Sequence, residues 1–285
     1  MKASDMKINK KYESILGRLD HYRNLISSVK FETIFEPLQL LIVDADDAEV
    51  KICTIDDIIS WHKELSYSFV VKINNIENQI LYLIDNEDIY SASILLRHHM
   101  EQCGYITLAT EKFIEFIKED SIEILEKFIA KTSFGSPLSN NKNTKNLHEA
   151  FMTTKTPNIV FFINALDRFI EQNYKTSDNK HFFTKNYCML NHFAHPSSLS
   201  SVFFVDSKIV ENGHELIFRY KQNALGDFGK HNMLKLLEQN IIVGYTSYFI
   251  FNSFIFEENK ITQNQDMIKY CWDNIINVFK KSNAE

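Results

Sequence analysis

Apolar residues recur along most of the chain with the spacing of helices rather than strands. In the first segment, 8–30, they fall at Ile15, Leu19, Tyr22 and Leu25–Ile26, which is one face of a helix. The same spacing predicts further helices over 55–84, 87–118, 121–132, 156–174, 180–195, 228–257 and 263–280. The pattern therefore indicates a mainly α protein.

Polar residues that can cap helices mark where these segments begin. Thr54 with Asp57 resembles a capping box, and so does Asp120 with Glu123. Asn86 is placed to cap the helix over 87–118. Thr156-Pro157 puts a cap before a proline at the first helical position, and Thr262 with Gln265 opens the last helix.

A strand pattern stands out in one place. The runs SVFFVDSKIV (201–210) and HELIFRYK (214–221) flank Asn212-Gly213, which is the strongest short signal for a β-hairpin. A lone hairpin is unstable, so we expect it to pack on the helices or to pair its edge with a partner. The predicted fold is a multi-helix bundle with one β-hairpin insertion at about 201–221, a single domain over 1–285 with a flexible loop at 133–146.

Composition narrows the class of protein further. The 285 residues are 45% hydrophobic and 24% charged, with only 7 Gly and 4 Pro. This composition excludes disordered and collagen-like chains and argues against a many-turned all-β fold. The net charge of −6 gives no global basic field for nucleic acid, although 130–185 carries a local basic excess that could contact a phosphate backbone. No GxGxxG, GxxxxGK[ST], GxSxG or HExxH motif occurs.

The lack of a signal-peptide pattern and the spacing of the cysteines predict a cytoplasmic protein. The segment 1–20 has no apolar core of signal-peptide length, and the 4 cysteines show no zinc-finger spacing. The uncharged run 241–256 is shorter than a membrane span needs and contains several polar residues. We expect this run to form a buried central helix and expect no membrane association.

Arg97 and Glu101 form the first candidate site, because helical residues four apart share a face. The pair borders a predicted core stripe made of Ile89, Ala92, Leu96, Met100, Cys103 and Thr107. The small residues Ser93 and Gly104 nearby would let another helix approach. Three interpretations stay open: a buried ion pair that fixes helix register, a site that positions an anion or a reacting group, and an exposed pair without consequence.

His192 and His195 form the second candidate site, since residues three apart share a helical face near the end of a helix. They could ligate a metal if Glu101 or His98 joined them, but the spacing supplies no such ligand. His195 could instead cap the helix or hydrogen-bond in the core, and either histidine could transfer protons. Of the neighbouring pair, we expect one of His98 and His99 to face the core and the other to face outward.

The two candidate sites together resemble a known group of proteins. The Arg97-x-x-x-Glu101 helix is followed by Tyr187-x-x-Leu190-x-x-x-x-His195-Pro196-Ser197. This arrangement is similar to uncharacterised bacterial all-helical proteins in which an Arg/Glu helix precedes a Tyr…Leu…His-Pro-Ser segment. The resemblance covers about 85–200 and implies a helical bundle, without an established activity.

More broadly, the chain resembles HEPN domains, which are helical proteins found as toxins and in phage defence. Many are metal-independent ribonucleases whose signature is an arginine followed four to six residues later by a histidine. The nearest match here is Lys185-Asn186 followed by His192, with lysine in the place of arginine. Lysine keeps the charge but lacks the planar, bidentate grip on phosphate.

The HEPN resemblance implies a ribonuclease, acting as a homodimer on RNA without a cofactor or metal. In it, His192 or His195 would activate a 2′-hydroxyl or protonate the leaving oxygen. Arg97 or Lys185 would steady the phosphate, with Glu101 orienting Arg97. The further substrate-binding residues would be Tyr187 and Asn191.

The alternative is a non-catalytic helical module for protein interaction or dimerisation. In that case Arg97, Glu101, His192 and His195 are a structural polar cluster, and the hairpin edge docks a protein partner. The sequence leaves open whether the chain is an enzyme.

Overall fold

A computed structural model gives the arrangement of most of the chain. It describes residues 6, 12–27, 41–43, 49–51, 55–133, 159–173, 181–194, 205–209, 216–220, 226–257, 260–269 and 273. The predicted loop at 133–146 lies, from 134 onward, outside the described residues.

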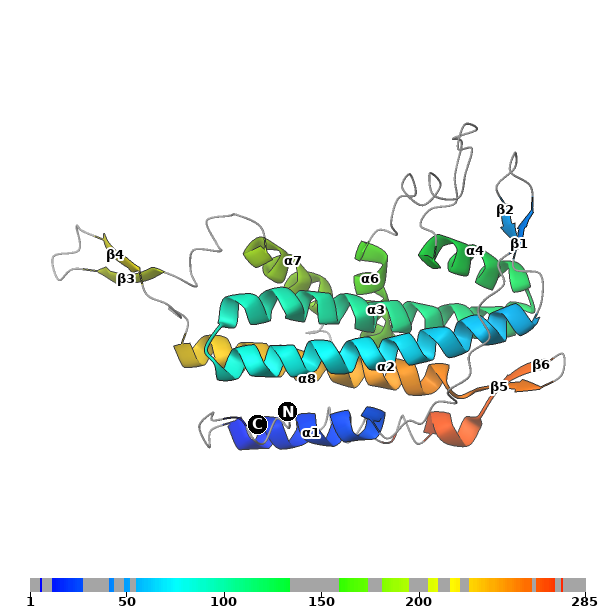
Figure 1. Cartoon of the computed structure of the whole chain (residues 1–285), viewed down its shortest axis with the longest axis horizontal. Coiled ribbons are helices and arrows are strands. Elements are labelled where there is room, and N and C mark those ends of the chain that lie inside the picture. The colour runs from blue at the N-terminus through cyan, green and yellow to red at the C-terminus, as the bar shows by residue number, and fades with distance from the viewer. Residues whose placement is uncertain are drawn as a thin grey trace. The chain divides into compact units, whose positions relative to one another are not determined.

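Helices make up most of the described residues, as predicted (Figure 1). They are α1 (Glu13–Ser27), α2 (Ile55–Asp85), α3 (Ile89–Glu119), α4 (Ile122–Ser133), α6 (Ile159–Asn173), α7 (Phe182–Ala194) and α8 (Gly226–Phe251). Their bounds differ from the predicted ranges by a few residues at most ends, which is normal for ends that fray.

The strands form antiparallel hairpins. The predicted one is β3 (Val205–Ile209) with β4 (Leu216–Tyr220), in the register Val205↔Tyr220. The sequence analysis did not predict two others, β1 (Leu41–Val43) with β2 (Glu49–Lys51) and β5 (Phe254–Glu257) with β6 (Lys260–Gln263). These are small additions to a mainly helical chain.

The chain forms two compact units, and four of the five points at which the chain passes from one unit to the other lie inside helices. The first unit comprises Met1–Val29, Val70–Cys103 and Leu166–Tyr245, and the second comprises Lys30–Phe69, Gly104–Ala165 and Thr246–Glu285. Both candidate sites from the sequence fall in the first unit.

In the first unit, a tight turn joins α2 to α3. The chain turns through Glu87, which has a left-handed φ of 65°, and the amide of Asp88 donates to the carbonyl of Leu83 at 2.8 Å. Asp88 is the N-cap of α3, because its Oδ1 accepts from the amide of Ser91 at 3.0 Å. The prediction that Asn86 caps this helix is therefore wrong: its side chain donates back to the carbonyl of Tyr82 at 2.8 Å.

The start of α4 also differs from the prediction. Asp120 has a φ of 50° and follows the end of α3, so Ser121, not Asp120, directly precedes α4. A left-handed residue between two helices turns the chain sharply, and Asp tolerates this conformation better than most residues.

In the second unit, α8 ends at Phe251, six residues before the predicted end at 257. The Ser253 hydroxyl donates to the carbonyl of Ile250 at 2.6 Å and ends the helix. The residues that follow, Phe254-Ile255-Phe256, are strand formers and pair with β6. Apolar spacing alone does not separate such a strand from a continued helix.

Aromatic rings form the core of the second unit. Trp61 stacks on Phe113, with ring centroids 5.9 Å apart and planes 6° apart. His62 stacks on Phe251 at 4.1 Å, and its Nε2 donates to the Phe251 carbonyl at 2.9 Å. That carbonyl is in the last turn of α8, where no helical amide remains to bind it. Burial is the main cause that lowers the pKa of His62, to about 4, so the ring stays neutral.

The uncharged helix predicted to lie in the interior is buried as expected. Most described residues from Ile241 to Phe251 are buried on every side of α8. Within the described part of the chain, no helix combines the length and the apolar character that crossing a membrane requires.

Candidate functional site

The core stripe predicted for α3 is confirmed. Its members from Ile89 to Thr107 are fully buried, and Arg97 and Glu101 flank them with side chains 24% and 16% exposed. The pair is thus neither sealed in the core nor fully solvated. Gly104 is needed for close packing, because a Cβ there would lie 2.5 Å from the Phe162 carbonyl oxygen of α6.

Arg97 and Glu101 meet Tyr187 of α7. The Tyr187 hydroxyl accepts from Arg97 Nε at 3.2 Å and donates to Glu101 Oε1 at 2.8 Å. Arg97 Nε is also 3.2 Å from Glu101 Oε1, and its guanidinium carbon lies 5.4 Å from the centre of the Tyr187 ring. His98 Nδ1 approaches Glu101 Oε2 at 3.3 Å. We call Arg97, His98, Glu101 and Tyr187 the Arg97 cluster.

The contacts within the Arg97 cluster shift two ionisations in opposite directions. Burial raises the pKa of Glu101, but hydrogen bonds from His98 and Tyr187 and the Arg97 charge outweigh it, so the pKa is lowered. Burial also raises the pKa of Tyr187, and the neighbouring Glu101 carboxylate adds to this. The cluster therefore holds a carboxylate next to a neutral phenol at neutral pH.

Arg97 is held at one end only. Among the described residues, its hydrogen bonds and ion pair are all made by Nε. The two terminal amino groups, Nη1 and Nη2, form the edge of the guanidinium that matches phosphate or carboxylate in a bidentate way. The contacts thus orient the guanidinium through Nε, while Nη1 and Nη2 make no hydrogen bond to a described residue.

Two of the other residues predicted for the site, Lys185 and His192, are not part of the Arg97 cluster. Lys185 and His192 are exposed and two turns apart on one side of α7, whereas Tyr187 is buried on another side. The Oδ1 atom of Asn191 is buried and finds no hydrogen-bond partner among the described residues. His195 lies outside the described residues. The structure thus joins Arg97, Glu101 and Tyr187, and places Lys185 and His192 elsewhere on α7.

The outcome for the neighbouring histidines follows the prediction. His98 is exposed and His99 is fully buried. His99 belongs to a second polar cluster that the sequence analysis missed. We call this group of Arg23, Glu77, His99, Cys103 and Tyr245 the Glu77 network.

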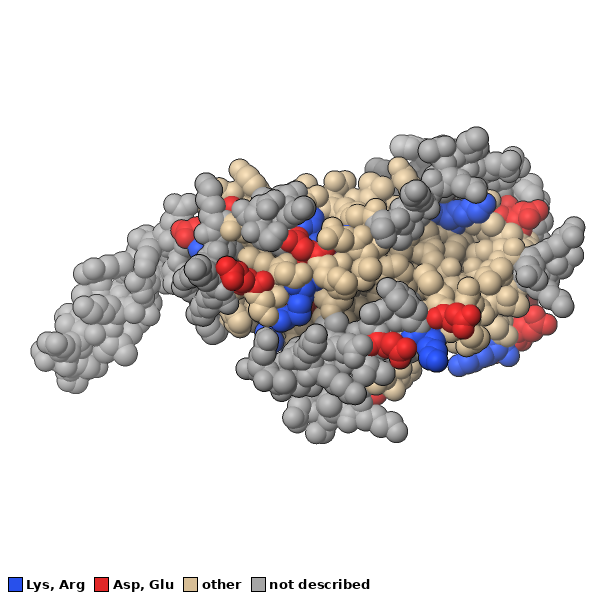
Figure 2. All heavy atoms as spheres, turned by 90° about the horizontal axis from the view of Figure 1, so that it is seen from below, with Lys and Arg blue, Asp and Glu red and all other residues tan. Residues whose placement is uncertain are grey.

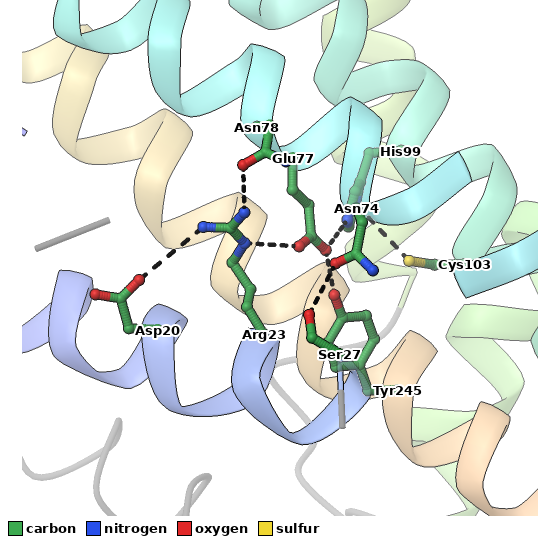
Figure 3. A network of polar contacts seen from close by, with 9 residues as sticks. All are labelled: Asp20, Arg23, Ser27, Asn74, Glu77, Asn78, His99, Cys103 and Tyr245. Carbon is green, nitrogen blue, oxygen red and sulfur yellow. Dashed lines mark hydrogen bonds and ion pairs between the residues drawn. The ribbon is translucent and has the colours of Figure 1, made fainter. Parts of the chain in front are cut away.

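In the Glu77 network, one fully buried carboxylate receives donors from three other helices (Figure 3). Tyr245 of α8 donates to Glu77 Oε1 at 2.6 Å, and His99 Nε2 of α3 reaches the same oxygen at 3.0 Å. Arg23 Nε of α1 donates to Oε2 at 3.1 Å. The carboxylate is therefore well satisfied despite its burial.

Cys103 completes the Glu77 network. Its Sγ lies 3.7 Å from His99 Nδ1, and burial, reinforced by the Glu77 charge, raises the pKa of the thiol. The thiol therefore stays protonated and places no negative charge beside the His99 ring. Burial and Glu77 likewise raise the pKa of Tyr245. The members of the network are buried, with only Arg23 reaching 9% exposure, so we interpret it as a structural link between α1, α2, α3 and α8.

One sequence signal could have found the network. Glu77 occupies a position of α2 where the apolar stripe of Ile73, Ile80 and Ile84 continues. A lone carboxylate on an apolar stripe must find donors from other elements. A sequence does not tell which elements supply them.

The distribution of charged residues outside the Arg97 cluster does not indicate a further binding site. Figure 2 shows one face on which the coloured basic and acidic residues are interspersed. The basic excess predicted for 130–185 depends largely on residues outside the described part: Lys142, Lys145, Lys155, Lys175 and Lys180. In the described ranges, no three His, Cys, Asp or Glu side chains are grouped so that they could hold a metal ion.

Comparisons with known proteins provide no further identification. No family model matches the chain, and neither the curated proteins nor the solved structures include a significant match. The function must therefore be argued from the chemistry of the Arg97 cluster.

Proposed function

We propose that this chain is a HEPN-like, metal-independent ribonuclease in which Arg97 contacts the phosphate. The observation that carries the proposal is the Tyr187 hydroxyl, which bridges Arg97 Nε and Glu101 Oε1. It holds the guanidinium in one orientation through Nε, and Nη1 and Nη2 make no hydrogen bond to a described residue. A fixed arginine edge is well suited to the phosphate of a nucleic acid.

Glu101 helps to orient Arg97, but it also reduces the positive charge that a phosphate would meet. Its lowered pKa keeps it charged, so it offsets the positive charge of Arg97. The proposal therefore depends on orientation rather than on net charge. Long-range attraction of RNA would have to come from other basic residues, such as the exposed Lys185.

The proposed reaction needs one base and one acid. The base takes the proton of a ribose 2′-hydroxyl, whose oxygen attacks the adjacent phosphorus while the bond to the 5′-oxygen breaks. The acid protonates that leaving oxygen, which yields a 2′,3′-cyclic phosphate and a 5′-hydroxyl. His192 and His195 remain the candidates for proton transfer, and a second copy of the chain could bring them to the Arg97 cluster.

The test uses a labelled single-stranded RNA in buffer containing EDTA, with the matching DNA as a second substrate. The wild-type chain should cleave the RNA and leave the DNA intact, because the reaction uses the 2′-hydroxyl. Arg97→Ala should reduce cleavage by at least about tenfold, and Arg97→Lys should restore only part of it. Lys127→Ala, which removes an exposed cation of α4, is the control and should cleave like wild type.

Two results would defeat this proposal. One is the absence of RNA cleavage by a folded wild-type chain, and the other is full cleavage by Arg97→Ala. His192→Ala and a separate His195→Ala then assign proton transfer, for which loss of about 10²–10⁴-fold is typical.

A non-catalytic interaction module is the second candidate, and the neutralisation of Arg97 by Glu101 favours it. In that case the Arg97 cluster only ties α3 to α7. The β3–β4 hairpin, which forms a sheet of two strands, would offer its edges to a protein partner or to a second copy. Dimerisation through that edge would be measured by sedimentation of the wild-type chain and of Lys208→Pro in β3. A dimer that forms through the edge should be lost in Lys208→Pro, because proline cannot donate a strand hydrogen bond.

A further inference from the structure

Asp167 of α6 lies against the first turn of α7 and is almost fully buried, with 4% of its surface exposed. Its Oδ1 accepts from the amide of Phe183 at 2.7 Å. Its Oδ2 accepts from both the amide and the hydroxyl of Thr184, at 3.0 and 2.6 Å. One carboxylate thus satisfies three donors at the start of another helix.

Among the described residues, the one that directly precedes α7 does not provide an ordinary cap. The residue before the helix is His181, which has a left-handed φ of 57° and an exposed side chain. An N-cap usually has extended backbone and a short polar side chain that accepts from the first turn. Asp167 supplies this acceptor from a different helix, and its negative charge also suits the positive end of the helix dipole.

This cap is one helical turn from the Arg97 cluster. Tyr187 follows Phe183 by four residues, which is about 6 Å along the helix axis. The hydroxyl of Tyr187 must reach both Arg97 and Glu101, at 3.2 and 2.8 Å. A shift of α7 by one residue, about 1.5 Å with a rotation of about 100°, would break both contacts.

We propose that Asp167 is a positioning residue for Tyr187: by capping α7 from α6, it fixes the height and rotation at which the phenol meets Arg97 and Glu101. Its effect on RNA cleavage rests on the function proposed above. The positioning itself does not, because it concerns only contacts within the chain.

Asp167→Asn is the informative variant, because it keeps the size of the side chain. The amide oxygen can still accept from Phe183, but the amide nitrogen then faces the Thr184 amide, which is also a donor. The cap is weakened on one side and α7 loses its fixed orientation. Thr184→Val, which removes the hydroxyl that donates to Asp167 Oδ2, is the milder second variant if Asp167→Asn does not fold.

The direct readout is NMR of the chain labelled at tyrosine Cζ, with Tyr187→Phe used to assign the Tyr187 signal. Burial and Glu101 raise the pKa of Tyr187 in the wild-type chain. In Asp167→Asn, we expect the Tyr187 signal to shift and its ionisation midpoint to move down toward that of free tyrosine. RNA cleavage should fall by about tenfold or more, as small misplacements of a positioning group do.

Glu238→Gln is the matched control. Glu238 is also a carboxylate with 4% of its surface exposed in the first unit, but it binds Arg18 of α1. Its loss should lower the thermal midpoint and move the signal of Tyr22, whose pKa is raised by burial and then by Glu238. The Tyr187 signal should stay in place.

A folded Asp167→Asn chain whose Tyr187 signal and midpoint match those of wild type would overturn the inference. Equal movement of Tyr187 in Glu238→Gln would also overturn it, because the effect would then be general loosening. If Tyr187 moves only in Asp167→Asn while the wild-type chain cleaves no RNA, the positioning role is supported and the proposed ribonuclease fails.

Discussion

Glu77 of α2 and His99 of α3 are both fully buried, and Nε2 of the histidine donates to the carboxylate at 3.0 Å. His99 is two residues from Arg97 on the same helix, so the helix is held toward α2 on one side and toward α7 on another. The orientation of the partly buried Arg97 cluster therefore depends on a bond inside the core.

Removing the buried carboxylate should destabilise the first unit strongly. Glu77→Ala leaves Arg23, His99 and Tyr245 without their shared acceptor, and breaking a buried ion pair in this way typically costs about 3–5 kcal/mol. Urea unfolding followed by circular dichroism measures this loss. Glu123→Ala, which removes an exposed partner of Lys127, should change the free energy of unfolding by less than about 0.5 kcal/mol. Similar losses in both variants would contradict the role of the network.

His62 should make stability depend on pH between about 4 and 6.5. Burial lowers its folded pKa from 6.5 to about 4, so in this range the unfolded chain binds a proton that the folded chain does not. The free energy of unfolding should fall by about 3 kcal/mol on going from pH 7 to pH 4 through this group alone. Urea unfolding at several pH values would show a smaller slope in His62→Gln than in wild type. If the slope of stability against pH is the same in His62→Gln as in wild type, the effect is contradicted. His21→Gln removes an exposed histidine as the control, and its slope should equal that of wild type.

Gly104 and Gly17 should respond in opposite ways to replacement by alanine. A Cβ at Gly104 would lie 2.5 Å from the backbone oxygen of Phe162, which is not free to move away, whereas a Cβ at Gly17 meets nothing within 4 Å. Gly17→Ala should stabilise α1 by about 0.5–1 kcal/mol, because alanine restricts the unfolded helix segment. Gly104→Ala should destabilise by about 1–3 kcal/mol from overpacking. The thermal midpoints of the two variants, compared with wild type, test this prediction. A higher midpoint for Gly104→Ala would mean that α6 packs less closely against α3 than in the structure.

Tyr187→Phe should change Glu101 more than it changes the fold. The variant removes the hydroxyl that donates to Glu101 Oε1 at 2.8 Å, so the pKa of Glu101 should rise toward its ordinary range. A carboxyl-carbon NMR titration of the chain would follow this. Loss of one hydrogen bond to a charged group should cost about 1.5–3 kcal/mol of stability. Tyr82→Phe, at an exposed tyrosine of α2, should leave both quantities unchanged, and a Glu101 titration that does not move in Tyr187→Phe would contradict the bridge.

Much of the helical fold could be predicted from local sequence patterns, whereas contacts between distant segments could not. The stripe of α3 from Ile89 to Thr107 was predicted residue by residue, because a period of 3.6 is a property of neighbours in sequence. The sequence predicts Asn86 as the cap of α3, whereas the cap is Asp88. Both residue types are good caps, and the backbone conformation of the turn determines which one is in position. The end of α8 was misplaced because Phe254-Ile255-Phe256 suits a helix and a strand equally by hydropathy.

The candidate site shows the same limit. Arg97 and Glu101 were found by their spacing of four, and Tyr187 by its motif, but their meeting requires α3 and α7 to lie side by side. Asp167 carried no signal, because its three donors lie on a different helix from its own. Glu77 carried a signal only as a charge on an apolar stripe.

The close approach of α8 to α3 at Gly244 makes Cys103 a built-in reporter of opening. A Cβ at Gly244 would lie 2.5 Å from the Cys103 sulfur, so no reagent can reach this thiol while the helices are together. Cys188 is exposed and should react at once. In a chain whose other three cysteines are replaced by serine, the rate of Cys103 alkylation would follow how often α3 and α8 separate. This would give the free energy of that local opening without any denaturant.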